Sequence, residues 1–166
     1  MATEKAALLT PDPPDDGAPD VLTALSADHQ KLLGLFETFE TALEEDSEDE
    51  ARDIAEEILS EIELHSRLEE EIFYPAAAEF DELVIMVDEA QREHAAIDQA
   101  IEEIRDEASD AAALANLMLR LQEEVEQHVR DEENLLFPRV EEVLEARLDE
   151  LGLRLQRRRE ELTDEG

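Results

Sequence analysis

Residues 65–75, "HSRLEEEIFYP", are repeated later in the chain by a close copy, "HVRDEENLLFP", at residues 128–138. Both copies read His-x-Arg-x-Glu-Glu, and both end in an aromatic residue followed by Pro. The chain contains only four histidines, and two of them open these copies. The other two, His29 and His94, each follow an acidic residue. This pattern indicates a weak internal duplication of two related segments.

From residue 20 onward the sequence has the apolar periodicity of helices and no alternating strand pattern. It predicts helices over about residues 20–44, 47–74, 81–107 and 109–138, and a shorter one over about 140–162 in which Gly152 is a weak point. The expected helix starts are Asp20, a capping box of Ser47 with Glu50, Asp81, and the Ser109-Asp110 pair. Pro138 should end or kink the fourth helix.

Short connections between long helices make neighbouring helices antiparallel. We therefore expect an all-α fold, an up-down-up-down four-helix bundle with a short fifth C-terminal helix. The expected division is a disordered, acidic, Pro-rich tail at residues 1–19, the bundle at 20–138 and a C-terminal helical extension at 139–166.

The composition restricts the possible partners. The formal net charge is −35, from 49 acidic and 14 basic residues, which disfavours nucleic acid and anionic membranes as partners. Acidic residues are spread along all the helical segments and 42% of residues are hydrophobic, which favours a folded domain with an acidic shell. Lys5 and Lys31 are the only lysines, as expected for a salt-rich cytoplasm.

The absence of Cys excludes disulfides and thiolate sites. No apolar run is long enough for a signal peptide or membrane span, so a cytoplasmic protein is expected.

Steps of three and four residues place a histidine on the apolar face of each of the four long helices, and a glutamate one turn later on the second and fourth. On those two helices the predicted faces end at Ile72 and Leu135. The six inward polar residues are His29, His65, Glu69, His94, His128 and Glu132.

Two simpler interpretations apply to any one of these residues. Of 166 residues 33 are Glu, so a His-x-x-x-Glu motif arises easily by chance, and a single inward His is more often a hydrogen-bonded core residue. The set of six favours metal, because no inward Lys or Arg is available to neutralise the carboxylates. Imidazole and carboxylate without thiolate suit iron, manganese or zinc.

The Glu-x-x-His motif of ferritin-like di-iron bundles is absent. The residues three positions before the four histidines are Ser26, Ile62, Gln91 and Val125.

The phrases "ADHQKLLGLFETFE", "HSRLEEEIFYPAA", "VDEAQREHAAID" and "QHVRDEENLLFP" resemble the hemerythrin-like (HHE cation-binding) domain over about residues 22–138. The resemblance implies a non-haem di-iron site. His29 and His65 would hold one iron, His94 and His128 the other, and Glu69 and Glu132 would bridge them beside an oxo or hydroxo group. Zinc and manganese remain alternatives.

This sequence departs from the oxygen-carrying members, which have a second histidine on the third helix. Ala90 and Asp98 stand four residues before and after His94. The departure favours reaction with oxygen, peroxide or nitric oxide in stress response or iron homeostasis, including catalase-like turnover. A non-catalytic oxygen or nitric oxide sensor, a carrier, an iron donor or store, and a structural zinc bundle remain open, as does the oligomeric state.

Other polar residues near the expected site are interpreted as structural. Asp28, Glu93, Glu61 and Glu124 could support the ligands or line an iron path, but solvated faces are favoured. The arginines at 154, 157, 158 and 159 are expected to pair with neighbouring Glu and not to form a docking patch, and Tyr74 is expected to be a packing residue.

Overall fold

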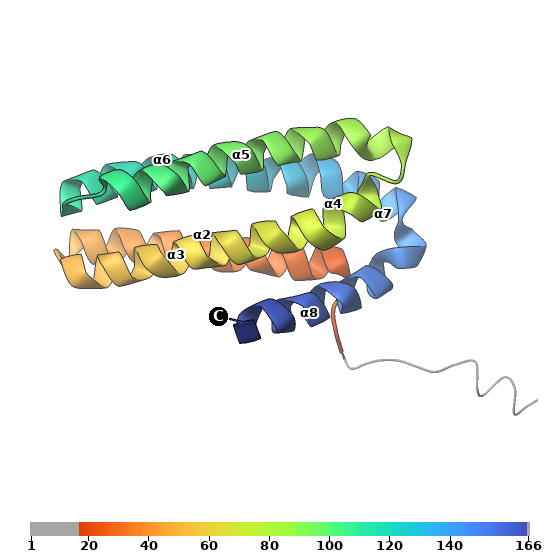
Figure 1. The fold of residues 1–166 in the computed structure, drawn as a ribbon, viewed down its shortest axis with the longest axis horizontal. Helices are drawn as coiled ribbons and strands as arrows, with labels where there is room; N and C mark the ends of the chain where they lie inside the picture. The colour runs from red at the N-terminus through yellow and green to blue at the C-terminus, as the bar shows by residue number, and fades with distance from the viewer. Residues whose placement is uncertain (1–16, 166) are drawn as a thin grey trace, which may run out of the picture.

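The computed structural model describes residues 17–165 of the chain. Four long helices, α2 (Val21–Glu44), α3 (Glu48–Leu68), α5 (Val84–Glu107) and α6 (Ala111–Asp131), lie side by side and alternate in direction (Figure 1). The expected all-α bundle is therefore confirmed. Most of the predicted N-terminal tail, residues 1–16, lies outside the described part of the chain.

Shorter elements join and extend these helices. A π-helical turn, η1 (Glu69–Phe73), leads from α3 into α4 (Tyr74–Ala77), and a 3₁₀ turn, η2 (Asp81–Leu83), precedes α5. A second π turn, η3 (Glu132–Leu136), leads from α6 into α7 (Phe137–Val143). A 3₁₀ turn, η4 (Glu145–Arg147), then precedes the last helix, α8 (Leu148–Glu165). The last helix begins later than residue 140 because residues 137–143 continue the fourth helix.

The predicted helix starts are partly correct. Asp20 and Asp110 accept capping hydrogen bonds from the backbone N–H groups of Thr23 and Ala113, at 2.9 and 2.8 Å. The capping box at Ser47 was a wrong prediction: the Ser47 side chain makes no capping bond, and its ψ of 77° differs from the extended ψ of 168° at Asp20. Asp81 was also wrong as a cap, because it lies in the 3₁₀ turn η2 and α5 begins one turn later.

Both prolines of the repeated segments are accommodated without ending a helix. Proline lacks an N–H and its ring collides with the carbonyl one turn earlier. The chain opens a π turn just before each proline, and the N–H groups of Tyr74 and Phe137 donate to the carbonyls of Glu69 and Glu132, five residues back. The fourth helix therefore does not end at Pro138, as one form of the prediction had it, since helical structure continues to Val143.

The extra residue in each π turn shifts the phase of the inward face. Ile72 and Leu135, predicted to point inward, are only half-buried and 57% exposed, respectively. The following residues, Phe73 and Leu136, are buried in their place. The predicted faces are therefore correct up to the two glutamates and wrong by one residue after them.

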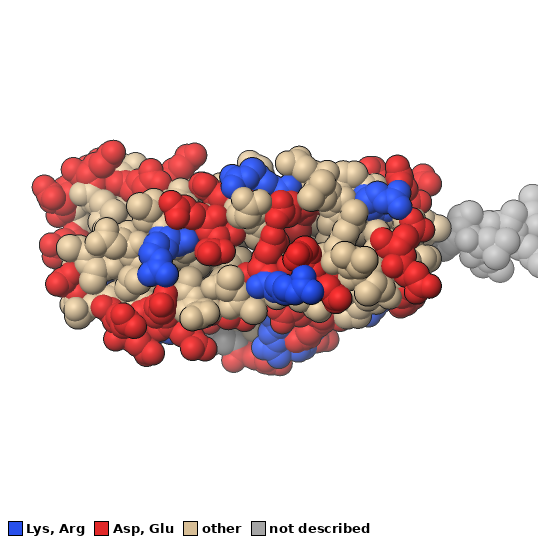
Figure 2. Space-filling view, turned by 90° about the horizontal axis from the view of Figure 1, so that it is seen from above, with Lys and Arg blue, Asp and Glu red and all other residues tan. Residues whose placement is uncertain are grey.

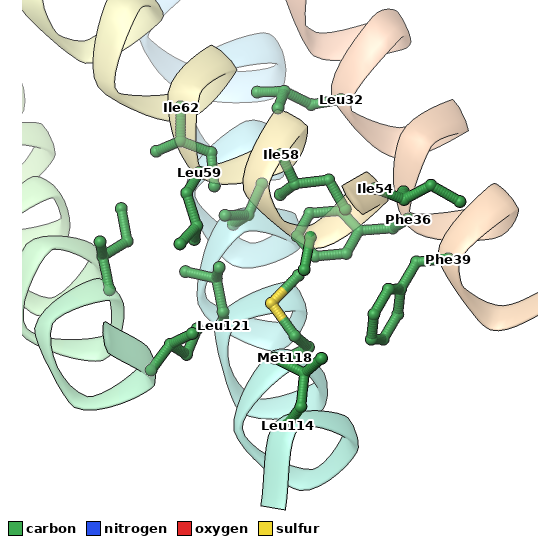
Figure 3. Close-up of a cluster of buried hydrophobic side chains, with 14 of the residues drawn as sticks. Leu32, Phe36, Phe39, Ile54, Ile58, Leu59, Ile62, Leu114, Met118 and Leu121 are labelled. Atoms are coloured by element: carbon green, nitrogen blue, oxygen red, sulfur yellow. The ribbon is translucent and has the colours of Figure 1, made fainter. Parts of the chain in front are cut away.

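The apolar interior consists of two clusters on either side of a polar layer. One cluster extends from Leu32 and Ile62 toward the α2–α3 and α5–α6 connections, and Phe36, Ile58, Met118 and Leu121 interlock there (Figure 3). The other surrounds Phe73, Tyr74 and Phe137 near the π turns. On each long helix the inward histidine lies between residues of the two clusters, so the polar layer is enclosed by apolar packing above and below.

Helix α8 packs against α2, α3 and η1, outside the four-helix core (Figure 1). Leu151 and Leu155 are buried there. Gly152, expected as a weak point, is a tight contact: a Cβ at this position would lie 2.1 Å from the carbonyl oxygen of Pro19. The absence of a side chain thus allows α8 to cross the start of the bundle.

Acidic side chains dominate the face shown in Figure 2, and the few basic groups on it adjoin acidic ones. Within residues 17–165 no helix combines the length and apolarity needed to cross a membrane.

Candidate metal centre

The middle layer of the bundle brings together all six inward polar residues expected from the sequence. Each is at most 4% exposed. Their ligand atoms form two groups in which every atom lies within 4.8 Å of the others. The groups are His29, His65, Glu69 and Glu132, and Glu69, His94, His128 and Glu132. Both groups contain the same two carboxylates, as two metal positions bridged by Glu69 and Glu132 would require.

The protein itself does not satisfy every polar atom at the centre of this layer. His65 Nε2 and Glu69 Oε2 are buried without a hydrogen-bond partner, although they lie 3.3 Å apart. His94 Nε2 and His128 Nε2 face each other at 3.2 Å. Buried polar atoms in proteins are normally paired, and lone pairs converging from imidazoles and carboxylates are the donor set of a cation site. The residues present therefore fit a bound metal.

Each imidazole is held from behind by a carboxylate at its Nδ1 atom. His29 contacts Glu133 at 2.6 Å and His94 contacts Glu70 at 2.7 Å, each partner lying next to an inward glutamate. The other two contacts are His65 with Asp28 at 2.9 Å and His128 with Glu93 at 2.8 Å. When Nδ1–H donates to a carboxylate, the neutral ring directs the lone pair of Nε2 toward the centre.

These carboxylates follow the internal duplication. Asp28 and Glu93 precede the histidines of α2 and α5 and hold the histidines of α3 and α6. The prediction that Asp28 and Glu93 belong to solvated faces was wrong, because the bundle turns them toward a neighbouring helix. Glu70 and Glu133 were missed, although the doubled "EE" in both copies was a signal for them.

The partners of Glu61 and of two arginines of α8, Arg158 and Arg159, are defined by the structure. Glu61 pairs with Lys31 at 2.8 Å. Arg158 pairs with nearby Glu161, as expected, but also with distant Glu71. Arg159 reaches Asp28 at 2.9 Å, so this part of the basic helix contacts the supporting carboxylates.

Without metal, the buried charges of the layer favour an imidazolium–carboxylate pairing at His65. Burial alone would lower the pKa of His65, but the charge of nearby Glu69 and the hydrogen bond with Asp28 raise it to about 10. Burial alone would raise the pKa of Glu69, but the three neighbouring histidines, led by His65, hold it well below its usual value. Burial and the charge of Glu69 raise the pKa of Glu132. A cation can replace the protons that now balance this charge.

Tyr74 is a residue of the site that sequence reasoning treated as packing. Its hydroxyl lies 3.0 Å from Glu69 Oε1 and 3.2 Å from His94 Nε2, and it also hydrogen-bonds Glu132. Burial, reinforced by the charges of Glu69 and Glu132, raises the pKa of Tyr74. The phenol is therefore a protonated donor to one of the two shared carboxylates when no metal is bound. The π turn η1 directs Tyr74 inward, and a regular helical spacing does not predict that direction.

Comparison with known proteins identifies the domain type. The family model described as the hemerythrin HHE cation binding domain matches residues 20–140, and again residues 93–165. No curated protein and no solved structure matches the chain.

Proposed function

This chain belongs to the hemerythrin HHE cation-binding family, and from that premise we propose that it is a non-haem di-iron protein reacting with oxygen, peroxide or nitric oxide in stress response or iron homeostasis. The observation that supports it most is that two groups of buried ligands have Glu69 and Glu132 in common. A single metal would leave some of these ligand atoms without a partner. We assign His29 and His65 to one iron, and His94 and His128 to the other.

Imidazole nitrogen and carboxylate oxygen without thiolate suit iron, zinc and manganese alike. Iron is proposed over the other two metals because the chain resembles the hemerythrin-like family, for which a di-iron site is expected, and metal analysis tests this choice. Tyr74, within 3.0 Å of Glu69, can add a phenol oxygen to the set or donate a hydrogen bond to it.

The asymmetry of the donor set bears on reactivity. Ala90 stands one turn before His94, where the oxygen carriers of the family have a second histidine. The half of the site formed by His94 and His128 therefore has no further nitrogen ligand from α5. An unfilled coordination position is what a reacting small molecule requires.

Disproportionation of hydrogen peroxide is the simplest redox reaction for such a protein. Two molecules of peroxide give two of water and one of dioxygen, so no outside reductant or oxidant is needed. A bound di-iron pair would supply the two-electron chemistry for this exchange. The chain's own contribution is to orient four imidazoles, through the carboxylates at their Nδ1 atoms, and to enclose the layer between apolar clusters.

The test begins with protein purified without oxygen and reconstituted with ferrous iron. Metal content is counted first, and the visible spectrum separates ferric pairs from spectroscopically silent zinc. Samples are then exposed in turn to dioxygen, hydrogen peroxide and nitric oxide. We expect two irons per chain and oxygen release from peroxide, lost in His94→Ala. Stoichiometric binding of oxygen or nitric oxide without oxygen release would identify a sensor or carrier instead, and a preparation that retains zinc and rejects iron would overturn the proposal.

A further inference from the structure

A pocket of about 120 Å³ opens between α5 and the π turn η3. Apolar side chains form its walls, and Glu132, one of the two shared carboxylates, lies at its inner end and is 1% exposed. The apolar lining residues are Ile85, Met86, Ala90, Leu135 and Leu136. The pocket therefore runs from the surface to Glu132, a carboxylate that both ligand groups of the metal centre share.

Two local features of the sequence create this opening. Ala90 is buried one turn before His94 and presents a methyl group where a larger residue would fill the space. The π turn directs Leu136 inward and leaves Leu135 at the rim, 57% exposed. Within residues 17–165, three large apolar residues are strongly exposed, and two of them, Ile85 and Leu135, line this pocket. Exposed apolar side chains gathered at one opening are characteristic of a ligand-binding site.

Carboxylates surround the apolar mouth. Glu89, Glu93 and Asp131 also line the pocket, and the chain as a whole carries a net charge of −35. A negative rim repels anions at a distance, and an apolar passage disfavours any solute that must shed a tightly held hydration shell. An uncharged, weakly hydrated molecule meets neither barrier.

We propose that this pocket, called the α5–η3 pocket below, is the access route and holding site for a small uncharged gas such as dioxygen or nitric oxide. It excludes anions, which the negative rim repels. The inference rests on the proposed function only for the metal at its inner end. The pocket selects the ligand before any reaction, and Ala90 is its specificity-determining residue.

The first experiment probes the pocket independently of metal. Xenon, a weakly hydrated atom that enters apolar cavities, is applied to the protein under pressure and located by crystallography or detected by xenon NMR. We expect xenon in the α5–η3 pocket of the wild type and its loss in Ala90→Leu. Ala95→Leu, an exposed site on the same helix, is the matched control and should keep the xenon signal. A wild type without xenon in this pocket overturns the proposal.

The second experiment measures ligand entry in the iron-loaded protein. Nitric oxide association followed by stopped-flow absorbance should slow at least tenfold in Ala90→Leu, with metal content unchanged, and remain at the wild-type rate in Ala95→Leu. Leu135→Trp covers the mouth from an exposed position, where folding is not at risk, and should also slow association. Wild-type rates in both blocking variants would show that the ligand enters elsewhere and would overturn the proposal.

The third experiment tests charge selection with azide as the anion. Glu89→Lys reverses one rim charge, and Glu102→Lys makes the same change at an exposed place on α5 away from the pocket. We expect several-fold faster azide association in Glu89→Lys than in Glu102→Lys, and no difference between them for nitric oxide. Equal azide association rates in the two variants would overturn the proposed exclusion of anions. A protein that loads no metal would defeat the proposed function, whereas the xenon measurement would still decide the pocket.

Discussion

Arg159, near the end of the chain, donates a hydrogen bond of 2.9 Å to Asp28, at the other end of the described sequence. Asp28 in turn contacts His65 Nδ1 at 2.9 Å. The C-terminal helix α8 is therefore connected to a candidate metal ligand through a single carboxylate. In this role Arg159 is a positioning residue, which acts on the site through Asp28.

Replacing Arg159 with Gln should weaken metal binding without unfolding the protein. Burial tends to raise the pKa of Asp28, and hydrogen bonds and charges from His65 and Arg159 lower it. Without Arg159 the carboxylate is held less firmly, and outer partners of metal ligands typically affect affinity by 10- to 100-fold. Competition with a chromogenic chelator measures this affinity. Arg157→Gln, an exposed change of the same charge, is the control, and equal losses in both variants would refute the positioning role.

Either shared carboxylate should be needed for a full complement of metal. Glu69→Ala or Glu132→Ala removes an oxygen donor from both ligand groups at once. We expect a largely helical protein by circular dichroism that holds clearly fewer than two metals per chain by elemental analysis. Glu123→Ala, on the exposed face of α6, should bind as wild type. Two full equivalents in both variants would contradict the bridging assignment.

Metal uptake should release protons at neutral pH. The pKa of His65 without metal is raised to about 10, above its ordinary 6.5, so the folded metal-free protein holds this proton through pH 7–8. Metal binding requires the neutral ring, so affinity should rise with pH through this range. Titrating metal into weakly buffered protein with a pH indicator counts the protons, and at least one per chain is expected at pH 7.5. Uptake with no release would contradict the imidazolium–carboxylate pairing.

The raised pKa of His65 also predicts that the stability of the metal-free fold falls as pH rises, whereas metal affinity rises. A raised histidine pKa contributes stability that is complete below pH 6.5 and is lost as pH rises toward about 10. Chemical denaturation of metal-free protein between pH 7 and 9 should therefore show falling stability, by at most about 1.4 kcal/mol per pH unit for one proton. The fall should be smaller in His65→Gln.

Gly152→Ala should destabilise the protein, although alanine favours helices by about 1 kcal/mol over glycine in an exposed helix interior. The added Cβ would lie 2.1 Å from the carbonyl oxygen of Pro19 and 2.8 Å from the backbone of Asp20. Backbone cannot give way as a flexible side chain would, so α8 must move from its place. A lower melting temperature is expected, and one equal to or above the wild type would show that α8 docks differently.

Salt should stabilise the fold. The surface carries mutually repelling carboxylates, as the face in Figure 2 illustrates, and the Debye length falls to about 3 Å at 1 M salt. The melting temperature of metal-loaded protein should therefore rise from low salt to molar salt, in agreement with the proposed salt-rich host. A flat or falling curve would remove that interpretation.

Helical periodicity was sufficient to predict the inward histidines. His29 and His94 lie on uninterrupted helices, where steps of three and four residues place a side chain reliably. The predicted inward direction of Ile72 and Leu135 was wrong because each lies in a π turn, which has one residue more than a regular turn. The local propensities of "EEEIF" and "EENLL" do not predict such a turn. Proline following each segment is the only sequence signal for this change of phase.

The supporting residues depend on how helices pack, which spacing along one helix does not encode. Asp28 precedes His29 in the sequence, but its carboxylate hydrogen-bonds His65 on another helix. Glu133 likewise serves His29, 104 positions away. Tyr74 became part of the site through the same π turn that displaced Ile72. Residues on one helical face were thus predictable, and contacts between faces were not.

The crossed pattern of carboxylates has an evolutionary consequence. The helix pair α2–α3, with its π turn η1, supplies Glu70 to a histidine of the second pair, and the pair α5–α6, with η3, returns Glu133 to a histidine of the first. Each pair also holds one of its own histidines, through Asp28 or Glu93. Two identical helical hairpins related by a twofold axis would offer the same six ligands and four supporting carboxylates. The centre is therefore one that a single ancestral hairpin could have assembled by self-association, with gene duplication and fusion later freeing the two halves to diverge.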